Sequence, residues 1–364
     1  MINCHKQGRK KVLKKIFLLT FLLATFIFVG CGSQAAENNS STENLSAENS
    51  EQNSASEKNN SEKKSSATKN VKGNLKITML NVGQGDAFLV QTKTQNILID
   101  TSDVDERSKL VEELDKAEVT NFDKIILTHP HADHIGGLEK ILKDSKYSVG
   151  EVCDNGIAST SKLYSGYMTL IKDKKIKHTS LKAGDILDFG YGVKFEVLYP
   201  TAELVKNVND GKQKTDPNNE SVVGRLVYKN FSMMFTGDAE KIVESNLWAD
   251  NDAKKLKSTI LKSGHHGSYT ASTENFLSVV QPEAVLISAG EPTEKRGGNT
   301  YGHPHVEPLQ NYLNAEIDEK NIFWSWENGT VVIESDGKNY SIEPEVKKDW
   351  VKKWIAEKKK NSKK

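Results

Sequence analysis

Cysteine is scarce in this chain of 364 residues, which contains only Cys4, Cys31 and Cys153. Only Cys153 lies beyond residue 31, and one thiol cannot form an internal disulfide. The main part of the chain must therefore fold without disulfide bonds. Internal repeats with a period of roughly 20–50 residues are also absent. The glycine-rich turn GQGD at 83–86 lacks the Lys-Ser/Thr pair of a phosphate loop, which argues against a nucleotide cradle.

The N-terminus has the pattern of an export signal. Basic residues come first, and residues 16–30 are then almost wholly apolar. This run is shorter than the roughly 20 residues of a membrane-spanning helix, which favours a secretory signal over residues 1–30. It ends in FVGCGS, which resembles the lipobox of bacterial lipoproteins, although Phe28 stands where leucine is more usual. The prediction is cleavage before Cys31 and its lipidation, which would anchor the chain at the extracellular face of the cell membrane. The alternative is an uncleaved anchor helix.

Composition divides the rest of the chain into three parts. Residues 31–73 are rich in Ser, Asn, Glu and Lys and cannot bury enough apolar surface to offset their conformational entropy, so a disordered linker is predicted. Residues 74–344 are enough for one domain with a substantial core. Residues 345–364 have nine lysines against three acids, and four apolar residues would share one face of a helix there. That tail could hold a polyanion, lie on anionic lipid, or be a solvated terminal helix. The four apolar residues are Trp350, Val351, Trp354 and Ile355.

Hydrophobic periodicity in residues 74–344 predicts an α/β fold with more strands than helices. Helices are predicted at 103–119, 138–142, 240–250, 273–280 and 305–313. Two sheets with helices outside are the economical way to bury this pattern. Strands are predicted at 75–80, 87–92, 96–100, 124–128, 194–199, 221–228, 232–236, 257–262, 284–288 and 329–335.

The stretch THPHADHIGG at 128–137 contains three of the nine histidines of the chain. Alternate residues of an extended segment face the same way, so His129, His131 and Asp133 converge, and His134 turns to an adjacent direction. Imidazoles and carboxylates are ligands of zinc and similar divalent ions. One ion uses three or four such ligands, so this density, with further ligands elsewhere, indicates two ions.

Two later loops contain further candidate ligands. FTGDAE at 235–240 ends a strand with Asp238, which could bridge both ions. SGHHGS at 263–268 offers His265 and His266 after another apolar strand. Each motif is weak alone, because a strand-end aspartate often caps a helix and a single histidine is often only packed, but together they indicate one metal site. Gly136 and Gly137 are predicted to let the backbone turn sharply behind the ligands.

These motifs are similar to those of the metallo-β-lactamase superfamily, whose His-x-His-x-Asp-His signature stands at 129–134. The chain resembles in particular the metal-dependent domain of ComEC competence proteins and its free-standing relatives, through stretches that occur in family order. The resemblance implies an αββα sandwich with the metal ions at one edge. The stretches are LNVGQGDAFLV (80–90), ILIDTSD (97–103), LTHPHADHIGG (127–137), NNESVV (218–223), MFTGDAE (234–240), LKSGHHGS (261–268) and TYGHPH (300–305).

The resemblance also implies a ligand set for two divalent ions, with Zn²⁺ favoured. His265 would be the late histidine ligand, with His266 as the alternative. Asp100, at the end of ILID, would orient ligands through hydrogen bonds. The remaining implied ligands are His129 and His131 for the first ion, Asp133 and His134 for the second, and Asp238 between the two.

One position departs from the family pattern. Many members place another histidine on the strand before the Gly-Asp pair, whereas this chain has NNESVV, so Asn219 falls there. The amide oxygen of Asn219 is a weak, neutral ligand. The first metal position is therefore expected to bind more weakly, or to prefer a harder ion such as Mn²⁺.

The implied reaction is hydrolysis by metal-activated water. Water between two cations loses its proton far more readily than bulk water, whose pKa is about 15.7, and the hydroxide attacks phosphorus or a carbonyl carbon. The candidate catalytic residues are Asp133, His266 and His303, and His303 or His266 would donate the proton to the leaving group. For His303 the alternative is a structural turn residue packed beside Pro304.

Fold alone does not identify the substrate. The resemblance implies a phosphodiester, and we predict a surface-anchored, monomeric phosphodiesterase or nuclease. The alternatives are a metallohydrolase of a cell-wall or small-molecule ester, such as teichoic-acid phosphocholine, and a noncatalytic binding lipoprotein. Residues 74–344 contain 30 Lys and Arg against 40 Asp and Glu, a formal charge of −10. This part of the chain therefore lacks the basic footprint of a nucleic-acid-binding domain.

Overall fold

The computed structural model describes residues 73–293 and 298–361, all of which belong to one unit of the chain, residues 62–364. The predicted signal 1–30, Cys31 and the linker up to residue 72 lie outside the described residues. Within the described ranges, no helix is both long enough and apolar enough to cross a membrane.

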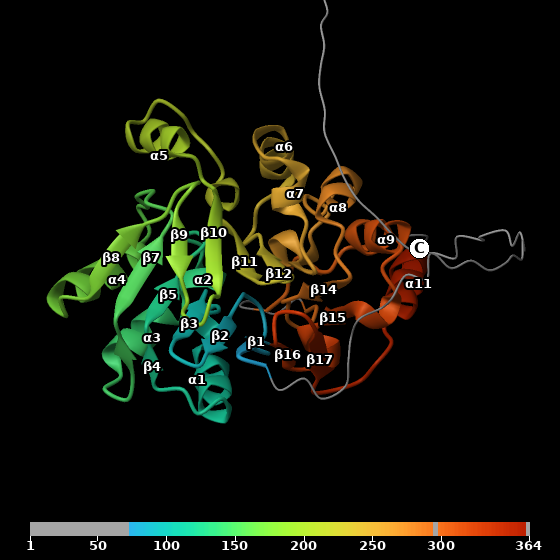
Figure 1. Cartoon of the computed structure of the whole chain (residues 1–364), viewed down its shortest axis with the longest axis horizontal. Helices are drawn as coiled ribbons and strands as arrows, with labels where there is room; N and C mark the ends of the chain where they lie inside the picture. The colour runs from blue at the N-terminus through green and yellow to red at the C-terminus, as the bar shows by residue number, and fades with distance from the viewer. Residues whose placement is uncertain (1–72, 294–297, 362–364) are drawn as a thin grey trace, which may run out of the picture. The chain divides into compact units, whose positions relative to one another are not determined.

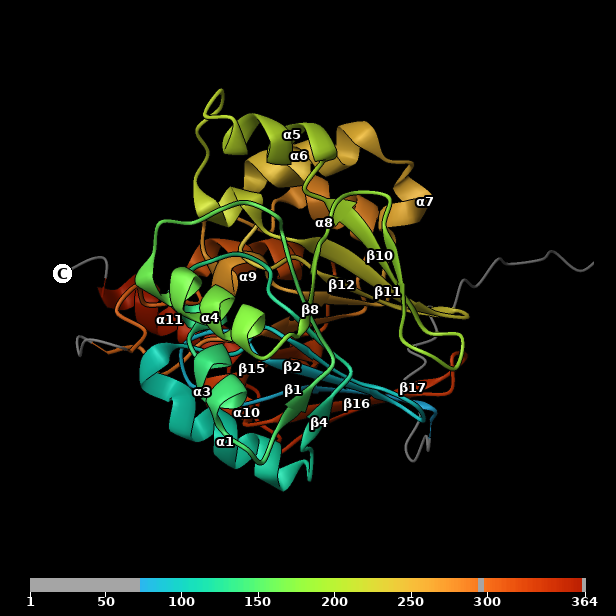
Figure 2. The ribbon, with the colours of Figure 1, turned by 90° about the vertical axis from the view of Figure 1, so that its left-hand side faces the viewer.

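Two β-sheets stack face to face and carry helices on their outer faces (Figures 1 and 2). A third, two-stranded sheet pairs β4 (Asn121–Phe122) with β6 (Ser148–Val149). The eight-stranded sheet has the order β17 (Tyr340–Pro344), β16 (Val331–Ser335), β1 (Leu75–Met79), β2 (Phe88–Thr92), β3 (Asn96–Ile99), β5 (Lys124–Ile126), β7 (Glu151–Asp154) and β8 (Lys177–Ser180). The seven-stranded sheet has the order β15 (Ile322–Trp324), β14 (Ala284–Ile287), β13 (Ile260–Lys262), β12 (Phe231–Phe235), β11 (Val223–Tyr228), β10 (Lys194–Tyr199) and β9 (Ile186–Asp188).

The helices form the two outer layers and several short connections. The eight-stranded sheet is covered by α1 (Arg107–Lys116), α3 (Leu138–Lys143) and α4 (Lys162–Asp173), and the seven-stranded sheet by α6 (Lys241–Asp250), α8 (Glu274–Val280), α9 (Val306–Asn314) and α11 (Val351–Asn361). The predicted αββα sandwich is thereby confirmed. The other helices are α2 (Ala132–Ile135), α5 (Ala202–Asn209), α7 (Ala253–Leu256) and α10 (Ser325–Asn328).

Three layers of apolar side chains hold the sandwich together. The central layer lies between the sheets, where the ring of Phe88 packs edge-on against Phe235 with centroids 5.5 Å apart. The outer layers lie between each sheet and its helices. A strand that is covered on both faces needs apolar side chains at every position. The strand β14 is such a strand, with an aliphatic sequence that is buried throughout.

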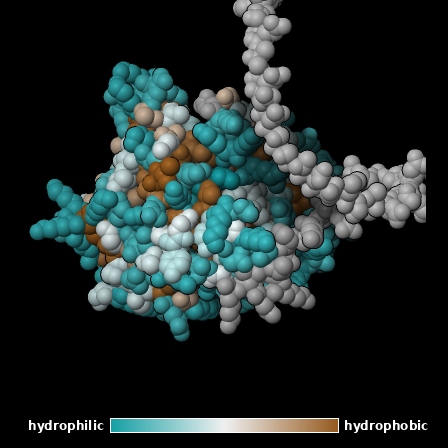
Figure 3. Space-filling view, viewed as in Figure 1, coloured by the Kyte–Doolittle hydropathy of each residue, from teal (hydrophilic) through white to brown (hydrophobic). Residues whose placement is uncertain are grey.

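The outer face of β10 is not covered by a helix. Its residues alternate between buried and more exposed, as expected for a strand with one solvated face. Figure 3 shows an apolar patch over β10 and β11, beneath α5. The alternating pattern of β10 explains why the predicted bounds, 194–199, agree with the structure.

The lysine-rich tail contains a helix that is part of the fold. The apolar face of α11 packs on the outer layer of the seven-stranded sheet, where Trp350, Val351 and Ile355 are buried. The rings of Trp350 and Trp354 lie 5.1 and 5.0 Å from that of Trp324. The apolar face is therefore packed against the fold and not available to lie on lipid, while most lysines of α11 are exposed together with Ala356, Glu357 and Asn361.

Candidate metal centre

The candidate ligands meet where the loops after three strands converge. β12, β13 and β14 are parallel neighbours, and β5 is parallel to β3 in the facing sheet. Carboxyl ends of parallel strands lie at one edge of a sheet. The loop after β5 holds the histidine motif, the loop after β12 holds Asp238, and the loop after β13 holds His265 and His266. The topology thus joins residues that lie more than a hundred positions apart.

Asp238 is the centre of this arrangement. Its Oδ2 lies 3.2 Å from Nε2 of His134 and 3.4 Å from Nε2 of His266. The Nε2 atoms of His129 and His265 lie 3.9 and 3.8 Å from the same oxygen. Four imidazoles therefore point at one buried carboxylate, which is the position predicted to lie between two ions.

Four of these groups form a compact donor set. One potential ligand atom each of Asp133, His134, Asp238 and His266 lies within 4.8 Å of the others. His266 Nδ1 lies 2.7 Å from the carbonyl oxygen of Ser288. A carbonyl only accepts, so Nδ1 carries the proton and Nε2 faces the carboxylates as a ligand atom. Asp133 remains partly exposed and forms the mouth of the site.

Asp100 orients His134 from behind. Nδ1 of His134 donates to Oδ2 of Asp100 at 2.8 Å, and Thr128 donates to the same carboxylate through its amide and its hydroxyl. This bond fixes the ring of His134 with Nε2 toward Asp238. The Nε2 atom is fully buried and lies 3.2 Å from Oδ2 of Asp238. Carboxylate-backed imidazoles are a common feature of metal sites.

His129 and His131 form the second half of the centre. Nε2 of His129 lies 3.1 Å from Nδ1 of His131. Two nitrogen ligands of one tetrahedral zinc ion lie about 3.3 Å apart, as follows from bond lengths of roughly 2.0–2.1 Å. The hydroxyls of Thr128 and Ser221 lie 3.2 and 3.3 Å from Nδ1 of His129 and hold its ring in place.

The charges of the centre fit a divalent cation. Burial lowers the pKa of His134, but Asp238 and Asp100 outweigh it and hold the pKa well above its usual value. His266 behaves in the same way, because burial is outweighed by Asp238 and Asp86. These two imidazoles thus keep protons where the ligand atoms of a metal would lie, whereas burial lowers the pKa of His129 and His265. Metal binding replaces such protons, so the residues present fit a divalent ion.

Two predicted ligands are placed differently from the sequence expectation. Asn219 turns away from the centre, because its amide exchanges hydrogen bonds with the backbone and side chain of Glu240. Its neighbour Asn218 lies beside His265 instead, with Nδ2 3.5 Å from His265 Nε2 and a buried Oδ1 without a hydrogen-bond partner. Consecutive residues of the 3-10 turn 217–220 point in different directions, so an error of one position changes the side chain that reaches the site.

His266 belongs to the compact donor set, whereas His265, the predicted ligand, lies outside it. His265 Nδ1 lies 3.3 Å from Glu240 Oε1 and 3.2 Å from the hydroxyl of Thr270, while its Nε2 faces Asp238. Both histidines have positive φ values, 45° for His265 and 53° for His266. This uncommon backbone conformation directs two consecutive side chains toward one carboxylate.

His303 lies next to the centre but does not have the pKa of an acid catalyst. Its ring centroid is 5.4 Å from that of His265 and 6.1 Å from that of His266. Burial, and then the neighbouring His266 and His265, lower the pKa of His303 to about 2. Its side chain is therefore neutral near pH 7, and a neutral imidazole is a much weaker proton donor than an imidazolium. The role of His303 as donor stays a prediction.

Sequence reasoning missed Asp86 and Lys262, which lie directly behind the ligands. Lys262 Nζ lies 2.6 Å from Asp86 Oδ2 and 3.6 Å from Asp238 Oδ1, with both carboxylates buried. The sequence did contain a signal for this pair, because Lys262 lies in the otherwise apolar strand β13. A buried lysine needs a partner of opposite charge. Gly85 brings Asp86 close, because a Cβ on Gly85 would lie 2.3 Å from the carbonyl oxygen of Asp133.

The predicted reason for Gly136 and Gly137 is wrong. Gly136 has a φ of −60° and Gly137 of −83°, which any residue adopts. A Cβ on Gly136 would lie 2.3 Å from the amide of Val104, and one on Gly137 would lie 2.2 Å from the carbonyl oxygen of Thr101. Close packing of the two segments requires these glycines, not a sharp turn.

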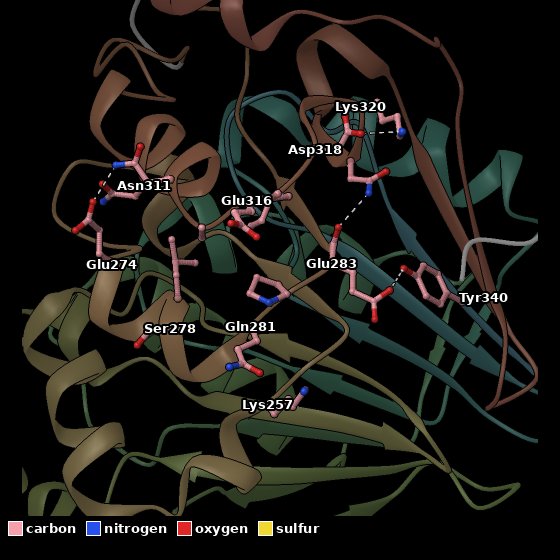
Figure 4. A pocket seen from close by; sticks show the side chains of 16 residues that line it. Lys257, Glu274, Ser278, Gln281, Glu283, Asn311, Glu316, Asp318, Lys320 and Tyr340 are labelled. Atoms are coloured by element: carbon pink, nitrogen blue, oxygen red, sulfur yellow. Dashed lines mark hydrogen bonds and ion pairs between the residues drawn. The ribbon is translucent and has the colours of Figure 1, made fainter. Parts of the chain in front are cut away.

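A cavity of about 850 Å³ lies at the other end of the seven-stranded sheet and is not the candidate site. It is lined by residues that precede β13, β14 and β15, whereas the candidate ligands follow β12 and β13 (Figure 4). Its charged groups have partners. Glu283 accepts from the hydroxyl of Tyr340 at 2.7 Å, and Asp318 pairs with Lys320 at 2.8 Å.

Comparisons with known proteins agree with this geometry. The model of the metallo-beta-lactamase superfamily matches residues 80–291. ComE operon protein 3 of Bacillus subtilis (strain 168) is 30% identical over 274 residues, which cover 70% of this chain and 32% of that protein. Competence protein ComA of Neisseria gonorrhoeae is 31% identical over 241 residues, 66% of this chain and 29% of that protein. This chain spans about a third of the length of these curated relatives.

Similarity to solved structures is found at low sequence identity. The metallo-beta-lactamase fold protein YhfI from Bacillus subtilis is 13% identical, with a TM-score of 0.39, and the match covers 58% of this chain and 85% of that protein. The family model covers more than half of the chain and includes the histidine motif, Asp238 and both late histidines. The chain belongs to the metallo-β-lactamase superfamily, and its curated relatives confirm the resemblance to competence proteins.

Proposed function

We propose that this chain is a metal-dependent phosphodiesterase with two divalent ions in its centre, anchored at the extracellular face of the cell membrane through lipidated Cys31. The observation that carries the catalytic part is the convergence of four imidazoles on Oδ2 of Asp238. A buried carboxylate surrounded in this way is suited to lie between two cations. Membership of a hydrolase superfamily supports the same reading.

The ligands divide into two groups around Asp238. His129 and His131 would hold one ion, and His265, whose Nε2 lies 3.8 Å from Oδ2 of Asp238, would complete that group. Asp133, His134 and His266 would hold the other. Bound ions would lower the pKa of water and neutralise charge on the phosphate oxygens. A donor set rich in imidazole favours Zn²⁺, whereas the carboxylates keep Mn²⁺ as the alternative.

A phosphodiester is the substrate class that the competence-protein relatives support best. One of them is named a competence protein, and this chain matches about a third of each. The partly exposed side chains of His131 and Asp133 leave the centre open to a substrate that approaches from solvent. An extended polymer therefore has access without a deep pocket.

Hydrolysis and metal content of the purified full-length protein test this proposal together. We expect two equivalents of Zn²⁺ or Mn²⁺ per chain and hydrolysis of bis-p-nitrophenyl phosphate and DNA. His131→Ala should remove activity and at least one equivalent of metal. His178→Ala is the matched control, since this histidine pairs with Asp154 at 2.8 Å, outside the metal centre. Hydrolysis of p-nitrophenyl phosphocholine alone would favour the ester alternative, and metal-free protein with full activity would refute the proposal.

The anchor needs its own test, because Cys31 lies outside the described residues. Growth of a bacterial host with labelled palmitate should label the wild-type chain and not the Cys31→Ala variant, which should also leave the membrane fraction. Cys4→Ala is the control and should keep the label. A membrane-bound Cys31→Ala variant would instead indicate an uncleaved anchor helix.

A further inference from the structure

The C-terminal helix α11 touches the loop that contains His303. The indole nitrogen of Trp354 donates to the carbonyl oxygen of Pro304 at 2.8 Å. Nζ of Lys358 lies 4.5 Å from the centre of the Trp354 ring, and a methyl group on Gly302 would lie 3.4 Å from that nitrogen. The lysine-rich segment therefore presents a cation on the surface of this loop. Both the loop and α11 lie outside the residues that the family model matches.

Two exposed tyrosines flank the same loop. Tyr301 is 71% exposed and stacks on His303, with centroids 5.6 Å apart and planes within 17°. Tyr269 is 61% exposed, and its ring meets that of His305 edge-on at 5.1 Å. The ring centroids of His303 and His305 lie 4.8 Å apart, so the four rings form a chain of contacts in which His303 is buried and both tyrosines are exposed. Neither tyrosine buries enough area to account for its presence by core packing.

This chain of aromatic rings reaches the histidines of the metal centre. The ring of His303 lies between Tyr301 and the two late histidines, at 5.4 Å from His265 and 6.1 Å from His266. A polymer whose phosphate occupied the centre would have a neighbouring unit near the exposed rings of Tyr301 and Tyr269. Planar bases stack on exposed tyrosines, and the flanking phosphate would meet Lys358. Polyol phosphates of cell-wall polymers have no ring to stack.

We propose that Tyr301, Tyr269 and Lys358 form a subsite for a base and its flanking phosphate in single-stranded nucleic acid, so that α11 helps to select the substrate. This inference rests on the proposed phosphodiesterase function. The proposed subsite also places a positive charge beside the position of the flanking phosphate. The formal charge of residues 74–344 is −10, whereas residues 345–364 contain nine lysines against three acids, and α11 brings Lys358 to the loop beside the centre.

A single-stranded oligonucleotide and its abasic counterpart test the subsite, because they differ only in their bases. Tyr301→Ala in the full-length protein should raise KM for the base-bearing strand about tenfold, the effect of losing one base–aromatic stack, and leave KM for the abasic strand unchanged. Tyr301→Phe should retain the wild-type KM. Tyr191→Ala is the matched control, since Tyr191 is also an exposed tyrosine, in the turn after β9.

Lys358→Ala should weaken binding of the base-bearing and the abasic oligonucleotide equally. It should also reduce the slope of log affinity against log salt concentration by about one. Lys353→Ala, on the same helix and 75% exposed in its side chain, is the control. Fluorescence anisotropy with chelator-treated protein measures binding without turnover. It therefore separates failure of the subsite from failure of the phosphodiesterase assignment.

The results divide clearly. Equal affinity of wild-type protein and Tyr301→Ala for the base-bearing strand would overturn the subsite, even if hydrolysis persists. An equal loss for the base-bearing and abasic strands would show that Tyr301 only supports His303, and would also overturn it. If the wild type binds the strand through Tyr301 but hydrolyses no phosphodiester, the proposed function fails and the binding surface remains.

Discussion

Replacing Lys262 by methionine tests how the buried charges behind the metal centre are balanced. Lys262 is 1% exposed, donates to the carbonyl oxygen of Gly237 at 2.6 Å, and pairs with Asp86 at the same distance. Burial lowers the pKa of Lys262, but Asp86 and Asp238 outweigh it and raise the pKa above its usual value. The side chain is therefore a buried cation, and methionine would remove the charge while keeping most of the volume.

The expected cost follows from the contacts that remain. Removing one partner of a buried ion pair costs about 3–5 kcal/mol, because the other charge stays buried without compensation. His266 Nδ1 lies 3.4 Å from Asp86 Oδ1 and would compensate in part. We therefore expect the lower end, about 3 kcal/mol of unfolding free energy. A bound divalent ion adds positive charge beside Asp238, so the cost should be smaller in metal-loaded protein.

Urea denaturation of chelator-treated full-length protein measures this cost. Tryptophan fluorescence follows unfolding, since Trp324 and Trp350 are buried. Lys255→Met, at an exposed position of α7, is the control. Adding Asp86→Asn to Lys262→Met should recover part of the loss, because it removes the orphaned carboxylate. A loss below about 1 kcal/mol, within the range of ordinary substitutions, would refute the reasoning.

Three further changes have definite expected outcomes. Asp100→Asn should lower metal affinity about 10–100-fold, because the ring of His134 loses its orienting carboxylate, and competition with a chromogenic chelator measures this. Adding Zn²⁺ at 100 times its Kd should raise the unfolding free energy by about 2.7 kcal/mol, and His134→Ala should abolish most of that rise. Burial raises the pKa of Glu244 to about 7 from 4.5, so its contribution to stability is complete below pH 4.5 and is lost as the pH rises through 7. That loss should be about 3 kcal/mol, and a urea-denaturation series at several pH values should be flatter for Glu244→Gln.

The fold was predictable where side-chain patterns repeat. Strands with aliphatic runs or clear alternation, such as β10 and β14, appear at or near their predicted bounds. β8 and β9 were missed, because each is short and half-exposed and has no period to detect. Helix α4 was also missed, although Ser161 caps it and its apolar residues recur at helical spacing, with Tyr167 and Ile171 buried.

The candidate site was predictable where its residues lie close in sequence. The histidine motif identifies its own chemistry, since alternate residues of one segment converge. For the later loops, the sequence identified the types of candidate ligands but not the directions in which their side chains point. Whether His265 or His266 faces the donor set depends on left-handed backbone values that no periodicity encodes. Likewise, Asn219 and Asn218 differ by one position in a 3-10 turn, and only the tertiary contact with Glu240 decides which one reaches the site.

The C-terminal segment shows why charge must be judged by position. By net charge alone, the acidic domain disfavours binding of nucleic acid, whereas the basic tail favours it. Folding resolves this, because the apolar face of α11 is held by Trp324 on the seven-stranded sheet, and the bond from Trp354 to Pro304 fixes the helix against the His303 loop. Lys358 then lies beside the loop that contains His303, next to the metal centre. Net charge predicts solubility and long-range attraction, whereas recognition depends on the few cations that the fold places beside the reacting group.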